Sequence, residues 1–294
     1  MANRAARLNT AFRAPARCEL GQLALRFGCG CAALCLCVKK IMILDKFKLN
    51  GKIALVTGAS RGLGQGMAIG LAEAGADVAL VASSSTDATA EKIRALGRRA
   101  CQIKADLLDQ NVIPHIVDTT VKALGGIDIL INNAGTIRRA PLLEFSEKDW
   151  DEVIQINQKS LFFLSQAVAK QMVAQGRGGK IINIASMLSF QGGIRVPSYT
   201  ASKSAVMGLT RILANELAAH NINVNAIAPG YMETDNTTAL RADAKRNAEI
   251  LARIPAGRWG STEDLQGAAV FLASAASDYM QGYTVAVDGG WLSR

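Results

Sequence analysis

Three side chains with the makings of a proton-transfer site stand close together in the chain: Ser186, Tyr199 and Lys203. A phenol has an unperturbed pKa of about 10, so tyrosine is a poor acid or base at neutral pH unless a nearby positive charge favours its phenolate. On a helix, residues i and i+4 share one face, which would place the Lys203 ammonium beside the Tyr199 phenol. The spacing alone is common in helices, so its meaning depends on the elements around it.

A glycine-rich run, Gly58-Ala-Ser-Arg-Gly62-Leu-Gly64, follows a predicted strand at Ile53–Thr57 and opens a predicted helix at Gly64–Ala74. Glycines there permit a tight turn and a close backbone approach, and the free N–H groups of a helix start attract a pyrophosphate. The run therefore predicts a dinucleotide site. Because its spacing differs from Gly-x-Gly-x-x-Gly, a tight turn without a ligand is the alternative.

From Lys52 onward, short apolar runs alternate with longer helical stretches, the pattern of a parallel sheet with crossover helices. The chain is predicted to form a single-domain α/β fold, a Rossmann-like doubly wound parallel sheet of about seven strands with helices on both faces. The predicted strands are Ile53–Thr57, Val78–Ala82, Ala100–Lys104, Ile127–Asn132, Lys180–Ala185, Asn223–Ala228 and Thr284–Val287. The predicted helices include Gly64–Ala74, Asp87–Leu96, Glu147–Ala174 and Ser198–Ala219.

Residues 1–41 differ in composition from the rest of the chain. The net charge of the 294 residues is +9, and this segment holds seven basic residues and one acidic one, so the body is only mildly basic. Five of the six cysteines also lie here, at Cys18, Cys29, Cys31, Cys35 and Cys37. We interpret residues 1–41 as a disordered or non-native extension, with a targeting segment or a metal site as alternatives, and residues 42–294 as the enzyme domain.

Several motifs together resemble the short-chain dehydrogenase/reductase family over about residues 48–294. They are the glycine-rich run beginning at Thr57, Asn132-Asn-Ala-Gly135, Ser186, Tyr199 with Lys203, and Pro229-Gly230. The resemblance implies that Ser186 holds the substrate oxygen and Tyr199 transfers the proton. It also implies that Lys203 lowers the tyrosine pKa and binds the nicotinamide ribose. Asn157 matches the fourth catalytic member, which bends its helix and supports a water relay.

The same resemblance implies a nicotinamide cofactor. Its predicted contacts are Gly58, Ser60, Arg61, Gly62, Leu63, Gly64, Asp106, Leu107, Asn133, Ala134, Gly135, Tyr199, Lys203, Pro229, Gly230 and Thr234. An acidic residue after the second strand would favour NAD, but that position reads Ala82-Ser-Ser84 and holds no carboxylate. Arg61 in the glycine-rich run is instead a candidate contact for the 2′-phosphate of NADP. Both NAD and NADP stay open, with a slight preference for NAD because hydroxyl-lined pockets also accept a bare ribose.

Further stretches resemble family members that act on deoxy-ketogluconates, which implies a sugar-acid substrate. They are Ser186–Arg195, Ala228–Met232, Arg253–Gly260 and Val287–Leu292. A carboxylate is best recognised by a fixed arginine, and the candidates are Arg138, Arg139 and Arg195. Gln191 and Tyr231 are candidates for sugar hydroxyls, beneath a substrate lid formed by residues 231–258.

Other functions are left open by the sequence. A 3-oxoacyl-carrier-protein reductase would use the same scaffold, and a non-catalytic cofactor-binding protein would keep the fold without turnover. His115 and His220 are far apart in the chain, so we expect no metal. We further expect a cytoplasmic homo-oligomer, in keeping with the tetramers common in the family, with no nucleic-acid or membrane partner.

Overall fold

This computed structural model of the protein describes residues 42–294. The expectations for residues 1–41, including the extension, its cysteines and its targeting or metal alternatives, lie outside the described residues.

Seven parallel strands form one sheet in the order β3-β2-β1-β4-β5-β6-β7. They are β1 (Ile53–Thr57), β2 (Asp77–Ala82), β3 (Ala100–Lys104), β4 (Ile129–Asn132), β5 (Gly179–Ile184), β6 (Ile222–Pro229) and β7 (Thr284–Val287). The predicted sheet is confirmed, with strand boundaries within two residues of those expected. The strand order reverses between β1 and β4, and α/β folds bind ligands at the carboxyl ends of the strands beside such a switch.

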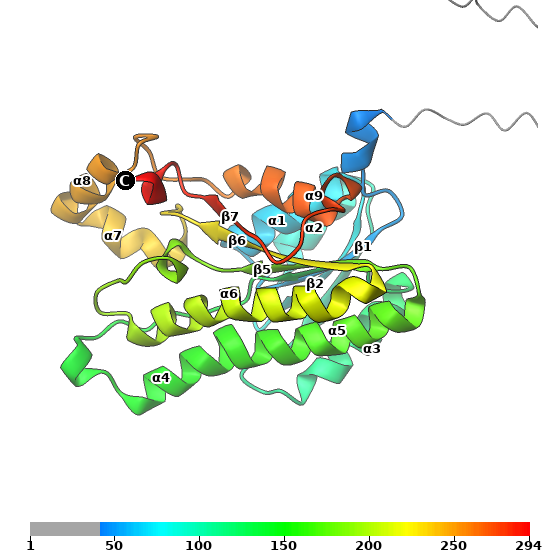
Figure 1. Ribbon diagram of the computed structural model, residues 1–294, viewed down its shortest axis with the longest axis horizontal. Helices are drawn as coiled ribbons and strands as arrows, with labels where there is room; N and C mark the ends of the chain where they lie inside the picture. Colours follow the sequence, from blue (N-terminus) through cyan, green and yellow to red (C-terminus); the bar gives the residue numbers. More distant parts are fainter. Residues whose placement is uncertain (1–41) are drawn as a thin grey trace, which may run out of the picture. The chain divides into compact units, whose positions relative to one another are not determined.

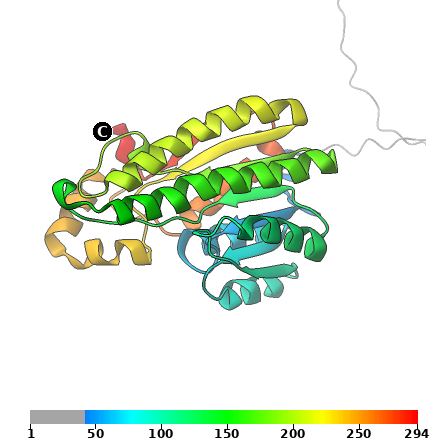
Figure 2. The same ribbon diagram turned by 90° about the horizontal axis from the view of Figure 1, so that it is seen from below.

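Helices cover both faces of the sheet (Figures 1 and 2). One face packs against α1 (Gly62–Glu73), α2 (Asp87–Ala95) and α9 (Gln266–Ala273), and the other against α3 (Val112–Leu124), α5 (Leu161–Gln175) and α6 (Pro197–Leu217). Successive strand residues point to opposite faces, so in β1 Ala54 and Val56 enter one core while Ile53 and Leu55 enter the other. The central strands β1 and β4 are largely apolar because both of their faces are buried.

The helix predicted at Glu147–Ala174 is not uniform. An α-helix, α4 (Glu147–Ile154), is followed by a π-helical segment at Gln155–Ser160 before α5 begins. Such π-helical turns inside α-helices are frequent at functional sites. Asn157 lies within this segment and is buried.

The predicted lid consists largely of helices, α7 (Thr238–Ala242) and α8 (Ala244–Arg253), which lie together at one end of the domain (Figure 1). Its far end is anchored by a small hydrophobic core of Met187, Ile250, Ile254, Trp259 and Trp291. The Tyr231 ring stands edge-on to both tryptophan rings, with centroids 5.3 Å and 4.7 Å away. Aromatic packing of this kind stabilises the lid on the C-terminal tail.

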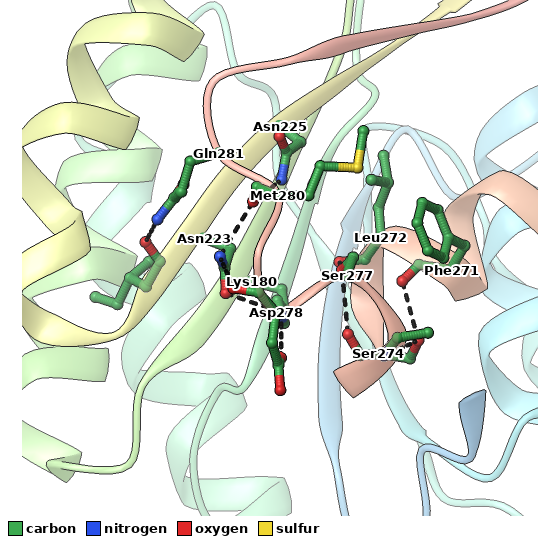
Figure 3. A network of polar contacts seen from close by, with 12 residues as sticks. Lys180, Asn223, Asn225, Phe271, Leu272, Ser274, Ser277, Asp278, Met280 and Gln281 are labelled. Carbon is green, nitrogen blue, oxygen red and sulfur yellow. Dashed lines mark hydrogen bonds and ion pairs between the residues drawn. The ribbon is translucent and has the colours of Figure 1, made fainter. Parts of the chain in front are cut away.

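The loop that leads into β7 is fixed by a polar network at the amino ends of β5 and β6, shown in Figure 3. Lys180 Nζ donates to Asn223 Oδ1 and forms an ion pair with Asp278, both at 2.8 Å. The amides of Asn223 and Asn225 donate to the Met280 carbonyl. No helix among residues 42–294 is long and apolar enough to cross a membrane.

Candidate active site

Ser186, Tyr199 and Lys203 converge at the carboxyl end of β5, as predicted. Ser186 follows that strand, while Tyr199 and Lys203 lie on the first turns of α6, where Pro197 opens the helix. The Ser186 hydroxyl lies beside the Tyr199 phenol and acts to lower its pKa. Lys203 Nζ lies 5.7 Å from the centre of the Tyr199 ring and donates to the Ile184 carbonyl at 2.6 Å.

Burial governs the protonation of this pair. Lys203 is 4% exposed, and burial lowers its pKa to about 8 because an apolar environment disfavours the ammonium. Burial also raises the pKa of Tyr199, against the smaller lowering effects of the Ser186 hydroxyl and the Arg139 charge. The expected lowering of the tyrosine pKa is therefore not observed, because desolvation of the phenolate outweighs the groups that stabilise it.

Asn157 connects the π-helical segment to the loop after β4 and to α6. Its carbonyl oxygen accepts the Thr136 N–H at 2.8 Å, and its amide donates to the Thr136 carbonyl at 2.9 Å and to Ser202 Oγ at 3.1 Å. Ser202 Oγ in turn donates to the Tyr199 carbonyl at 2.8 Å. The side chain of Asn157 thus fixes the loop at Thr136 relative to the helix turn that carries Tyr199.

Ser189 is a residue to which the sequence analysis gave no role. Its hydroxyl accepts the Ser186 N–H at 3.2 Å and donates to the Lys203 carbonyl at 2.6 Å. One hydroxyl therefore joins the backbones of two predicted catalytic residues. Its position three residues after Ser186, as in a serine capping box, is the signal that would have identified it.

The glycine-rich run lines a cavity of about 460 Å³, which also reaches Tyr199 and Lys203. Most of the predicted cofactor contacts line it: Gly58, Ser60, Arg61, Gly62, Leu63, Asp106, Leu107, Asn133, Ala134, Gly135, Tyr199, Lys203 and Thr234. The two serines after β2, Ser83 and Ser84, line it as well. Pro229 and Gly230 line a neighbouring cavity instead.

The backbone around the glycines has the close packing that a phosphate cradle needs. Gly58 adopts φ +64°, a conformation that favours glycine, and a Cβ on Gly64 would overlap the Gly58 carbonyl and the Asn133 amide. The Asn133 amide donates to the Thr57 carbonyl at 2.9 Å, and Thr57 Oγ1 accepts the N–H groups of Asn133 and Ala134. These residues would hold a dinucleotide by its pyrophosphate, with the start of α1 supplying N–H donors.

A larger cavity of about 880 Å³ adjoins the first one. The two share the residues Leu63, Ile184, Tyr199, Thr234 and Asn236. We call this shared set the junction. Tyr199 belongs to it, so a proton donor stands where a cofactor in one cavity would meet a substrate in the other.

The predicted substrate residues divide into two groups. Gln191, Tyr231, Arg139 and Arg195 line the larger cavity, whereas neither cavity is lined by Arg138. Arg138 instead pairs with Glu152 and, at 3.5 Å, with Asp149 of α4. Its charge is thus already compensated on the neighbouring helix.

Arg139 and Arg195 differ in how they are held. Arg139 Nη2 donates to the Asn236 carbonyl at 3.2 Å, which joins the loop after β4 to the lid. Arg195 is exposed, and its backbone is left-handed with φ +64°, a conformation uncommon outside glycine. Its carbonyl accepts the Ala140 N–H at 3.1 Å, which helps to hold that turn.

Metal ligands are not assembled in the described part of the chain, where no group of three or more His, Cys, Asp or Glu side chains could hold a metal ion. Ser186, Tyr199 and Lys203 thus form the core of a candidate active site with acid–base groups beside a nucleotide cradle.

Comparison with known proteins agrees with this site. The family model for short chain dehydrogenases matches residues 52–245. The chain is 65% identical over 253 residues to 2-dehydro-3-deoxy-D-gluconate 5-dehydrogenase of Escherichia coli (strain K12), covering 86% of this chain and all of that protein, and equally similar to the protein of the same name from Dickeya dadantii (strain 3937). A solved gluconate 5-dehydrogenase from Burkholderia cenocepacia in complex with NADP and tartrate is 41% identical, with a TM-score of 0.82 over 86% of this chain and all of that one.

The chain belongs to the short-chain dehydrogenase family. It is an NAD(P)-dependent oxidoreductase that acts on a CH–OH group. The resemblance stated from its motifs is thereby confirmed.

Proposed function

We propose that this enzyme interconverts a hydroxyl and a ketone on a deoxy-ketogluconate, as a 2-dehydro-3-deoxy-D-gluconate 5-dehydrogenase. The observation that carries the proposal is the larger cavity, which brings Ser186 and Tyr199 together with several arginines. The arginines around this cavity suit a substrate with a carboxylate. The name and full-length match of the Escherichia coli relative support the same substrate class.

The chain's own residues can perform the acid–base part of the reaction. In ketone reduction the Tyr199 phenol donates its proton to the substrate oxygen, while the Ser186 hydroxyl donates a hydrogen bond to that oxygen. In alcohol oxidation the proton returns to Tyr199, and the charge of Arg139 favours the phenolate that accepts it. A bound nicotinamide supplies or accepts the hydride.

Lys203 and the glycine-rich run would hold the cofactor. The Lys203 ammonium lies at the wall of the smaller cavity, where it suits a ribose hydroxyl. We propose that the cavity accepts both NAD and NADP, since no carboxylate follows β2 and Arg61 lines the same wall. The NADP in the Burkholderia cenocepacia structure supports NADP as one of the two cofactors.

The oligomer and the compartment remain proposals as well. We propose a cytoplasmic homotetramer in carbohydrate metabolism. Support for subunit contact comes from β7, an edge strand whose side chains are partly exposed, and from the neighbouring Tyr279 and Tyr283, which are exposed.

The decisive measurement is a set of initial rates over deoxy-ketogluconates, gluconate and a 3-oxoacyl thioester, each with NAD(H) and NADP(H). We expect the highest kcat/KM with a deoxy-ketogluconate. Replacing Tyr199 by Phe should lower kcat by at least about 100-fold, because the proton donor is lost while the ring remains. Cofactor affinity, measured by fluorescence titration, should persist in this variant.

Three outcomes would contradict the proposal. A higher kcat/KM with the thioester would identify a carrier-protein reductase. Cofactor binding without turnover of any substrate would identify a non-catalytic protein. Full activity of Tyr199→Phe would assign proton transfer to another group.

A further inference from the structure

Arg253 is a cation of the larger cavity that has no role in the site described so far. It lies at the last position of α8 and lines the cavity together with Gln191 and Trp291. Its guanidinium stacks on the Trp291 ring, 4.0 Å from the ring centre, and its Nη2 donates to Gln191 Oε1 at 3.1 Å. Stacking and a hydrogen bond together fix the plane of the guanidinium.

The partners of Arg253 are uncharged, so its positive charge stays uncompensated. Glu249 precedes it by one turn on α8, but the carboxylate of Glu249 pairs with Arg246 at 3.1 Å. Asp243 also lines the cavity, and its carboxylate accepts the backbone N–H of Arg246 at 3.0 Å. Within residues 42–294, no carboxylate forms an ion pair with Arg253. A preoriented guanidinium without an acidic partner is suited to binding an anion.

The position of Arg253 separates it from the reacting atoms. Arg139 bonds to the carbonyl of Asn236, a junction residue, and its charge acts on Tyr199. Arg253 instead contacts Gln191 and Trp291, which line the larger cavity and not the smaller one. Arg139 therefore lies near the substrate oxygen that reacts, and Arg253 lies on a part of the wall that the cofactor cavity does not reach.

We infer that Arg253 binds the substrate carboxylate and sets the preference for sugar acids, with Trp291 and Gln191 as the residues that position it. This inference rests on the proposed function. In a sugar acid that reacts at carbon 5, several carbon–carbon bonds separate the carboxylate from the reacting carbon. A cation beside Tyr199 is thus poorly placed for the carboxylate, and one farther along the cavity can form a bidentate pair with it.

The test compares a deoxy-ketogluconate with its carboxamide, which has the same length and no charge. Arg253→Met should lower kcat/KM for the acid by about 10- to 100-fold, mainly through KM, because a charge-assisted hydrogen-bonded pair is lost. The value for the amide should change far less, so the preference for the acid should largely disappear. Arg253→Lys should recover part of it, since an ammonium keeps the charge but not the bidentate geometry.

Lys245→Met is the matched control, because it removes the same charge from the same helix at an exposed residue that lines neither cavity. Circular dichroism and cofactor titration confirm that each variant is folded. Equal losses on the acid and the amide in Arg253→Met would show a structural role and overturn the inference. A wild-type enzyme that turns over neither compound would overturn the proposed function, and the assignment of Arg253 with it.

Discussion

At the scale of single residues, we propose that the choice between NAD and NADP depends on the Arg61 guanidinium. Arg61 lines the cofactor cavity, yet its Nε also pairs with Asp235 at 3.3 Å, and both side chains are largely exposed. Exposed ion pairs contribute little to stability, so the 2′-phosphate of NADP could readily displace the Asp235 carboxylate from Arg61. The sequence predicted Arg61 as a candidate cofactor contact but gave no indication of Asp235, its partner from the lid.

Replacing Arg61 by Ala is expected to raise the KM for NADP by about tenfold and to leave the KM for NAD nearly unchanged, since the 2′-phosphate alone loses a charged contact. Replacing Asp235 by Asn should shift the KM for NADP downward, because it frees the guanidinium. Steady-state kinetics with both cofactors measures the two effects. An unchanged KM for NADP in Arg61→Ala would remove Arg61 from phosphate recognition.

At the scale of elements, the site depends on how the turn after β5 is joined to α6. Ser189 Oγ makes that connection through the Ser186 N–H and the Lys203 carbonyl. Asn157 makes a second one, from the π-helical segment to Ser202. In each case a side chain forms a hydrogen bond to another element. Such bonds hold the catalytic residues in position relative to one another more tightly than packing alone.

Loss of the Ser189 hydroxyl in Ser189→Ala is expected to lower kcat by about tenfold, with little change in the KM for substrate or cofactor. The reason is that the Ser186 N–H and the Lys203 carbonyl lose their common partner. Ser189→Thr, which keeps the hydroxyl, should recover much of the rate. Ser198→Ala is the control, since the buried Ser198 hydroxyl has no hydrogen-bond partner within residues 42–294. A lower melting temperature with unchanged kcat would mean that Ser189 serves stability and not the geometry of the site.

At the scale of the whole molecule, we propose that residues 42–294 form the enzyme domain. The Escherichia coli relative matches 253 residues of this chain over its own full length, and Ile41–Arg294 forms one compact unit. Every residue of the candidate site lies within this unit.

A chain that begins at Met42 is therefore expected to keep kcat/KM within about twofold of the full chain, because no part of the site is removed. Light scattering should give a tetramer for both chains. A large loss of activity on truncation would assign residues 1–41 to the functional protein. A smaller assembly of the shortened chain would place them at a subunit contact.

The sequence by itself determined the strands, the glycine cradle and the trio of Ser186, Tyr199 and Lys203. These features are local: strands follow from apolar runs, and a pair four residues apart on a helix needs no further information to meet. The serine could be added because it ends a strand of the same sheet. The substrate class came from resemblance, not from any pattern of charge.

Only the tertiary structure decided which arginines line the larger cavity and how burial acts on the pKa of Tyr199. Arg138 forms an ion pair with Glu152, whereas Arg253, which is distant in the sequence, forms a hydrogen bond with Gln191 and stacks on Trp291. Neighbours of this kind depend on the path of the whole chain, which residue spacing does not encode. The pKa of Tyr199 likewise depends on burial, and burial is a property of the packed fold.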